Sequence, residues 1–205
     1  MNINIFIILI LLTFFISISY IYGFRKNYRL IKNVAKRLEE ELQPIDKTYT
    51  WLGGVVGFSA EYNVVDLSKI KITFSTIPRQ SILFLPIAIL MGRYDKLELL
   101  IPVKKKILND INIVKKSPLN YINIKSNDLT EKIYLSENSL KFIIYSKNRS
   151  DNPNILIKDF ASFFKKGLNQ LIFSKINNTC YLNIKINKHN FHIINNLIQK
   201  LNELC

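Results

Sequence analysis

The chain has 205 residues and a formal net charge of +14 at pH 7, from 29 Lys and Arg against 15 Asp and Glu. This balance favours anionic partners such as lipid headgroups or nucleic acid, and it argues against basic ones. With only two cysteines, the chain does not rely on a disulfide framework for its stability.

An apolar stretch without a charged side chain occupies residues 3–24. As an α-helix it would be about 33 Å long at about 1.5 Å per residue, which is enough to cross a hydrocarbon core of about 30 Å. We therefore interpret residues 1–24 as a transmembrane anchor. The alternative is a cleaved secretory signal, but the segment starts without Lys or Arg, is long, and has bulky Tyr20 and Tyr22 beside its only small-residue pair, Ser17 and Ser19.

Basic residues follow the apolar stretch directly, whereas the other flank offers only the amino terminus. Cationic flanks remain in the cytoplasm, so we expect a single-pass protein of the cell membrane with its N-terminus outside and its C-terminal domain cytoplasmic. Near an anionic leaflet each of these cations would add about 1 kcal/mol of attraction. The predicted membrane-contact residues of this segment are Arg25, Lys26, Arg29, Lys32, Lys36 and Arg37.

Residues 25–45 predict a basic juxtamembrane helix, because apolar residues recur at helical spacing from Tyr28 to Leu42 and the cations fall on the other face. This helix and the anchor would form one rod. Pro44 should end it. We expect the acidic run 39–41, in the last turn, to pair with cations such as Lys36 and Arg37.

Residues 46–205 predict an α+β cytoplasmic domain with a mostly antiparallel sheet and two or three helices. A subdomain boundary is predicted near 147–154, a polar stretch with Pro153. The pattern predicts a hairpin or bent strand over 48–65, strands at 69–76, 97–103, 121–125, 132–135 and 140–146, a hairpin over 171–187, and helices at 155–166 and 190–204.

The segment 81–91 has no charge and is too short to span a bilayer. Packing in the domain core is the first expectation for it. The alternative is a segment that dips into the membrane interface beside the anchor.

A second cationic run, Lys104, Lys105 and Lys106, is joined later by Lys115 and Lys116. We favour a lipid-facing or solvated patch over a nucleic-acid groove, because few aromatic residues are interleaved for base stacking. Arg79 and Arg93 are candidate ligand or anion contacts. For Arg79 with Gln80, and for Arg93 with Asp95, structural pairing is the favoured interpretation.

No arrangement of residues predicts a metal, a cofactor or a catalytic group. His189, His192, Cys180 and Cys205 are the types that bind zinc, but Cys180 should face the core and Cys205 lies roughly 24 Å along a helix from His189. The glycines between 53 and 57 lack the lysine and hydroxyl of a phosphate loop.

The stretches Thr50-Trp-Leu-Gly-Gly-Val-Val-Gly-Phe58 and Pro78-Arg-Gln-Ser81, which follow the apolar segment and the basic helix, resemble a group of uncharacterised archaeal membrane-anchored proteins. The resemblance covers residues 1–103. It implies a location at the membrane and no particular activity.

These observations predict a non-enzymatic, membrane-anchored interaction or binding module. Its expected partners are a bilayer with anionic headgroups and a protein partner at the membrane. Two alternatives stay open: a membrane-tethered nucleic-acid binder, and an enzyme with a dispersed site in a pocket around Trp51, Arg79 and Arg93.

Overall fold

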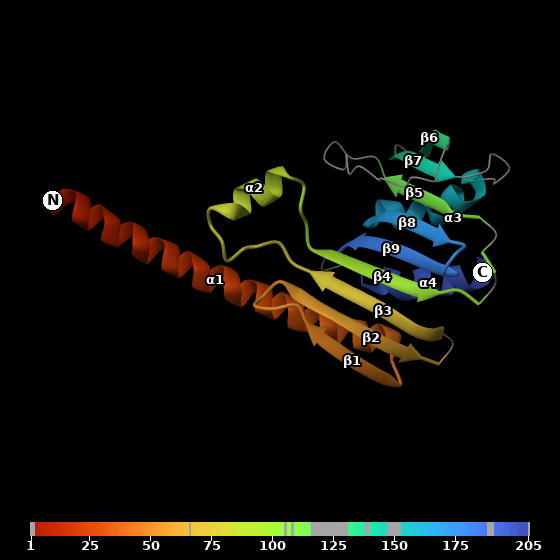
Figure 1. Cartoon of the computed structure of the whole chain (residues 1–205), viewed down its shortest axis with the longest axis horizontal. Helices are drawn as coiled ribbons and strands as arrows, with labels where there is room; N and C mark the ends of the chain where they lie inside the picture. Colours follow the sequence, from red (N-terminus) through yellow and green to blue (C-terminus); the bar gives the residue numbers. More distant parts are fainter. Residues whose placement is uncertain are drawn as a thin grey trace.

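The computed structural model describes residues 3–65, 67–104, 106–107, 109–115, 131–137, 140–146, 153–187 and 191–204. Within these ranges it has four helices and nine strands (Figure 1). In chain order they are α1 (Ile3–Leu42), β1 (Asp46–Trp51), β2 (Gly57–Val64), β3 (Leu67–Ser75), α2 (Phe84–Leu90), β4 (Lys96–Pro102), β5 (Ile111–Lys115), β6 (Glu131–Glu137), β7 (Leu140–Ser146), α3 (Pro153–Lys165), β8 (Leu168–Ser174), β9 (Thr179–Lys185) and α4 (His192–Leu204).

All nine strands form one sheet in the order β1-β2-β3-β4-β9-β8-β5-β7-β6, and every neighbouring pair is antiparallel. This confirms the predicted antiparallel α+β class, with three helices after α1. The C-terminal hairpin β8–β9 lies between β4 and β5. Chain segments on both sides of the predicted boundary near 147–154 therefore belong to the same sheet, although most of that stretch lies outside the described residues.

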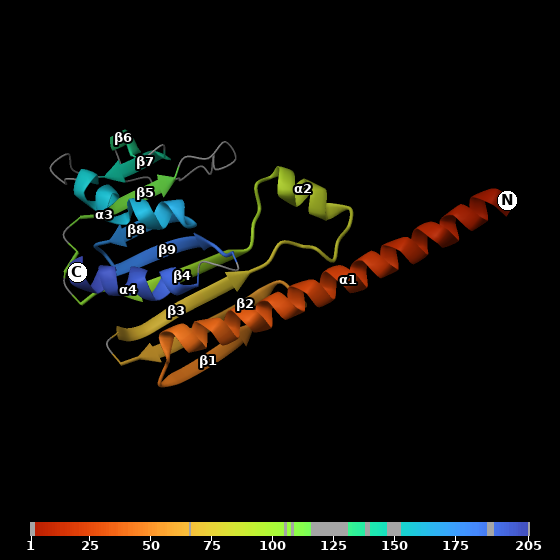
Figure 2. The same ribbon diagram turned by 180° about the vertical axis from the view of Figure 1, so that it is seen from behind.

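The two halves of α1 have different environments. Residues Ile31, Val34, Leu38 and Leu42 recur at helical spacing and lie in the same buried cluster as the inner face of the sheet. Together with α3 and α4, this half covers one face of the sheet (Figure 2). The N-terminal half projects beyond the sheet, and its apolar side chains are exposed (Figure 1).

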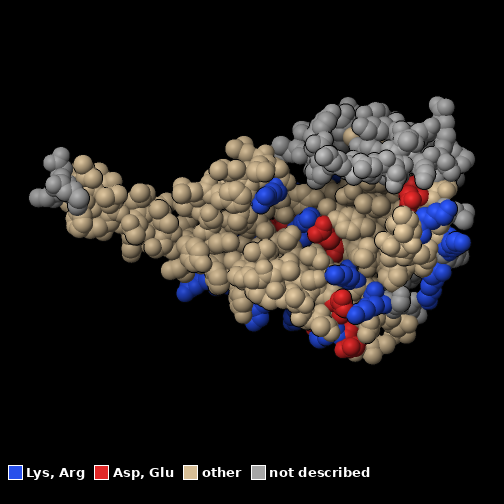
Figure 3. Space-filling model, viewed as in Figure 1, with Lys and Arg blue, Asp and Glu red and all other residues tan. Residues whose placement is uncertain are grey.

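The projecting half of α1 is long and apolar enough to cross a membrane. A signal sequence near an N-terminus shares these properties. On the face seen in Figure 3, charged side chains begin near the middle of α1 and are lacking along its projecting part. The predicted single rod is confirmed, because one uninterrupted helix joins the two halves.

The C-terminal end of α1 is held by side chains of the first hairpin. Glu39 accepts hydrogen bonds from Lys47 Nζ at 2.6 Å and from Tyr49 Oη at 2.7 Å, and these bonds hold the pKa of Glu39 below its ordinary value of 4.5. Glu40 pairs with Lys36 at 3.6 Å, as predicted for this acidic run. The helix ends at Leu42, before Pro44.

Two turns have the backbone conformation that glycine and asparagine adopt readily. Gly167 (φ 123°) ends α3, and Asn178 (φ 48°) turns the hairpin between β8 and β9. Strand β5 is not among the strands predicted above, and the predicted strand 121–125 lies outside the described residues.

The expectation that 81–91 packs in the core is wrong: among its residues only Ala88 is buried, while Leu83, Ile87 and Leu90 are exposed.

The burial of Leu38 gives a test of the role of α1 in the core. Leu38→Ala should lower the free energy of unfolding of the full chain in mild detergent by about 2–5 kcal/mol, because a fully buried side chain leaves a cavity. Leu11→Ala is the same substitution in the exposed half of the same helix, and it should change the free energy of unfolding by less than about 0.5 kcal/mol. Equal effects in urea unfolding would show that α1 is not part of the core.

Candidate anion-binding groove beside the first helix

Asn27 is a fully buried polar residue of α1, at the point where the helix leaves the sheet domain. Its Nδ2 donates to the carbonyl oxygen of Ile77 at 2.8 Å and to Gln80 Oε1 at 3.2 Å. Its Oδ1 accepts a hydrogen bond from Arg79 Nη1 at 2.9 Å. A single amide side chain thus binds α1 to the loop that follows β3, and burial without these partners would be costly.

Arg79 extends this network to the start of β4. Its guanidinium forms a two-pronged ion pair with Asp95, with Nη1 to Oδ1 at 2.8 Å and Nη2 to Oδ2 at 2.6 Å. The backbone amide of Ile77 also donates to Asp95 Oδ1 at 3.1 Å. Both charged side chains are mostly buried, so this pair holds the loop with fixed geometry.

Gly23 allows the same loop to approach α1 closely. A Cβ at this position would lie 2.1 Å from the carbonyl oxygen of Arg79, which is far inside contact distance. Gly23 is also buried within a helix. Glycine is required here because the backbone of another segment occupies the space of a side chain.

A groove of about 730 Å³ opens next to this network. One wall is the face of α1 from Tyr22 to Arg37, and the opposite wall comes from the Arg79 loop, the end of β9 and the start of α4. Its lining residues are Tyr22, Arg25, Lys26, Arg29, Leu30, Asn33, Val34, Arg37, Arg79, Asp95, Ile186, Asn187 and Phe191.

The charge of the groove is strongly positive. Arg25, Arg29 and Arg37 follow one another at four-residue or eight-residue intervals and so share a face of α1, with Lys26 beside them. Among the described residues of the lining, Asp95 is the only carboxylate, and the ion pair with Arg79 neutralises it. Among the described residues, Arg25, Lys26 and Arg29 have no ion-pair partner, and the guanidinium of Arg37 lies 5.1 Å from the ring centroid of Phe191.

This arrangement is suited to bind an oxyanion. Guanidinium groups present several N–H donors in a plane and match phosphate or carboxylate oxygens, and Lys26 adds a point charge. Arg25 and Lys26 also stand directly after the apolar stretch of α1. The geometry offers binding and orientation of an anion, and the described lining residues include no nucleophile with an adjacent base.

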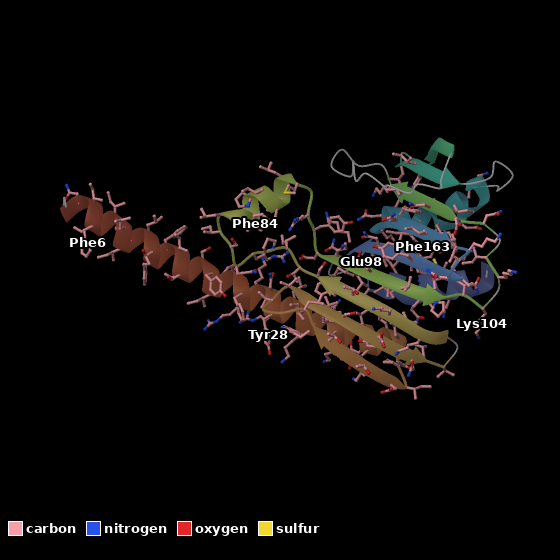
Figure 4. All side chains as sticks on the ribbon, viewed as in Figure 1. Phe6, Tyr28, Phe84, Glu98, Lys104 and Phe163 are labelled. Carbon is pink, nitrogen blue, oxygen red and sulfur yellow. The ribbon has the colours of Figure 1, made fainter. Side chains whose placement is uncertain are left out.

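Of the nine residues predicted as membrane or anion contacts, four lie together in the groove. Lys36 pairs with Glu40, and Lys32 Nζ lies 5.6 Å from the ring centroid of Tyr28. Figure 4 places Lys104 at the opposite end of the domain from Tyr28 and Phe84. Lys106 is exposed, and Lys105 lies outside the described residues.

The predicted pocket around Trp51, Arg79 and Arg93 needs correction. Only Arg79 lines the groove, because Trp51 donates its Nε1–H to Gly54 within the first hairpin and Arg93 lies over Phe84 of α2. The expected pair of Arg93 with Asp95 is also replaced, since Asp95 binds Arg79.

Of the two cysteines and two histidines of the chain, only the side chain of Cys180 is described, and it is buried in β9. No group of three or more His, Cys, Asp or Glu able to hold a metal occurs among the described residues.

Sequence reasoning missed Asn27 and Gly23. The sequence does contain a signal for them. A glycine and a polar residue lie four positions apart where the apolar helix becomes basic, and this pattern is expected where another segment packs closely against a helix.

The sequence matches no protein-family model, and a search of curated proteins finds no match. The resemblance to archaeal membrane-anchored proteins stays a prediction.

Substituting Asn27 tests the network. In Asn27→Ala the carbonyl of Ile77 and the side chains of Gln80 and Arg79 lose a buried partner, so we expect about 1–3 kcal/mol of destabilisation. Backbone amides of the 76–95 segment should exchange hydrogen faster in the full chain in detergent. Asn33→Ala, at an exposed position of the same helix, is the matched control. Equal exchange rates of the 76–95 amides in the two variants would contradict this role of Asn27.

Proposed function

We propose that this chain is a single-pass membrane protein whose sheet domain lies in the cytoplasm, and whose groove binds the phosphate of anionic ligands at the membrane surface. The observation that carries this proposal is the position of the groove. Its cations begin where the exposed apolar half of α1 ends, and four of them line one concave surface.

The exposed surface of α1 supports an anchor. About twenty residues project with apolar side chains all around the helix, and such a surface is unfavourable in water and favourable in hydrocarbon. The helix continues without a linker into the core of the domain. An anchor of this kind would hold the groove at a fixed distance from the bilayer, which a flexible tether would not.

The distribution of charge supports the cytoplasmic orientation. Arg25, Lys26 and Arg29 follow the apolar half, and residues 3–24 carry no charge. Short cationic flanks remain on the cytoplasmic side, where the leaflet carries anionic lipids. The same cations would then meet phosphate groups of lipid headgroups or of phosphorylated small molecules.

The alternative of a nucleic-acid binder has less support. A nucleic-acid surface needs a continuous cationic track. Lys104, however, lies at the opposite end of the domain from Tyr28, which is on the same stretch of α1 as the cations of the groove (Figure 4). Lys115 uses its ammonium group to donate to the carbonyl of Phe164. The groove has a volume of about 730 Å³, which is room for a headgroup or a small ligand.

Retention and orientation of the anchor can be tested in membranes. The full chain should resist extraction by alkaline carbonate, and mass spectrometry of the mature protein should show residues 3–24 still present. A C-terminal fusion to alkaline phosphatase should be inactive, whereas a fusion to a cytoplasmic fluorescent protein should fluoresce. Loss of the N-terminal segment, or an active phosphatase, would contradict the proposal.

Charge removal in the groove tests the ligand. With the full chain in nanodiscs of phosphatidylcholine, Arg25→Gln with Arg29→Gln should weaken binding of short-chain phosphatidic acid about 30-fold, since each lost cation near a phosphate removes about 1 kcal/mol. Inorganic phosphate, titrated separately, distinguishes a headgroup site from a site for free phosphate.

Lys104→Gln with Lys106→Gln removes the same charge outside the groove and serves as the control. It should leave binding nearly unchanged. An equal loss in both double variants would show that diffuse charge, rather than the groove, attracts the lipid. Tighter binding of a single-stranded oligonucleotide than of the lipid would favour the nucleic-acid alternative.

A further inference from the structure

Helix α2 exposes apolar side chains to an unusual extent. Within the helix, Leu90 is 76% exposed, Ile89 54% and Ile87 51%, and Ala88 is its only buried residue. The flanking residues Leu83 and Met91 are 78% and 59% exposed. The stretch from 81 to 91 has no charged residue. A continuous apolar surface of this kind on a domain in water is unfavourable and marks a contact site.

The segment that carries α2 is firmly held at its base. Arg79, before the helix, is bound to Asp95, after it, and both are linked to Asn27 of α1 through Arg79. Within the segment, the amide of Leu85 donates to Ser81, and that of Arg93 donates to Ala88. The exposed surface of α2 therefore has a fixed position relative to α1.

That position is at the end of the apolar half of α1. The loop leading to α2 contacts α1 at Gly23, the penultimate residue of the uncharged stretch 3–24. Along the long axis of the molecule, α2 lies level with the middle of α1, on the side of the sheet from which the apolar half projects (Figure 1, Figure 4). Arg93 lies 5.4 Å from the ring centroid of Phe84, so a cation and an aromatic ring mark the edge of this surface.

We propose that α2 inserts into the headgroup and acyl boundary of the bilayer beside α1, as a second membrane contact of the domain. This inference rests on the proposed membrane anchor. The occupant is lipid because the exposed surface of α2 lies at the level where α1 changes from apolar to cationic. A helix of seven residues is too short to span, whereas an interfacial helix buries one face about 5–10 Å deep.

Two contacts constrain the domain more than one. A single helix leaves the domain free to rotate about the helix axis, but α1 and α2 together define a plane. The loop that precedes α2 contains Arg79, which also lines the groove. Insertion of α2 thus sets the orientation in which the groove faces the headgroups.

The test uses an environment-sensitive fluorophore on a single cysteine at position 87. The full chain carries Ile87→Cys and Cys205→Ser, and its remaining thiol, Cys180, is fully buried. It is reconstituted in vesicles of phosphatidylcholine and phosphatidylglycerol. We expect quenching by nitroxide-labelled acyl chains, and iodide quenching roughly fivefold weaker than at a water-exposed site.

Two reference positions bracket the result. A label at Phe14, in the exposed half of α1, reports the anchor, and a label at Ile176, which is 88% exposed in the turn between β8 and β9, reports water. Iodide quenching at 87 equal to that at 176 would overturn the proposal. Protection at 87 from both iodide and acyl-chain quenchers would overturn it too, because protein would then cover α2.

This experiment distinguishes a failed anchor from a failed insertion of α2. If residues 3–24 did not span the membrane, the label at position 14 would also escape quenching by the acyl-chain nitroxides. Leu83→Asp with Leu90→Asp should expose the label at 87 to iodide, and both side chains are exposed enough for the fold to tolerate the change. Val65→Asp with Ile176→Asp alters two similarly exposed apolar residues elsewhere and should leave the protection intact. Equal quenching in the two double variants would contradict insertion through α2.

Discussion

The buried side chain of Asn27 is the interaction on which the arrangement of the molecule depends. It lies inside α1, where an apolar helix becomes a basic one, and it satisfies donors and acceptors of the loop after β3. Because a buried amide without partners is costly, this loop has one position against the helix. The close contact at Gly23 and the ion pair of Arg79 with Asp95 complete that constraint.

The groove and the exposed surface of α2 both follow from this constraint. The groove exists because the loop and the start of β4 are held opposite the cationic face of α1. Helix α2 is exposed because the loop that precedes it is fixed against α1 at Gly23, and the helix itself does not pack on the core. In the proposed membrane setting, one network would thus position a site for phosphate and a second contact with the bilayer.

Local periodicity predicted much of the fold. The alternation of β3, the amphipathic pattern of α4 and the turn at Asn178 were sufficient because each buries one face against a sheet or a helix, and that face shows in the sequence. Strand β5 lacked such a signal: it is five residues long and stands between cationic runs. Its place next to β7 and β8 comes from pairing with strands distant in the chain.

The sequence by itself determined that an uncharged helix precedes a basic one, that they form one rod, and that an antiparallel α+β domain follows, because these depend on composition and on spacing along one element. Only the tertiary structure decided which partner Asp95 takes, which cations share a groove and that residues 81–91 face outward. The reason is physical: ion pairs, close backbone contacts and burial depend on segments that meet in space, and an apolar run has the same sequence whether protein or lipid covers it.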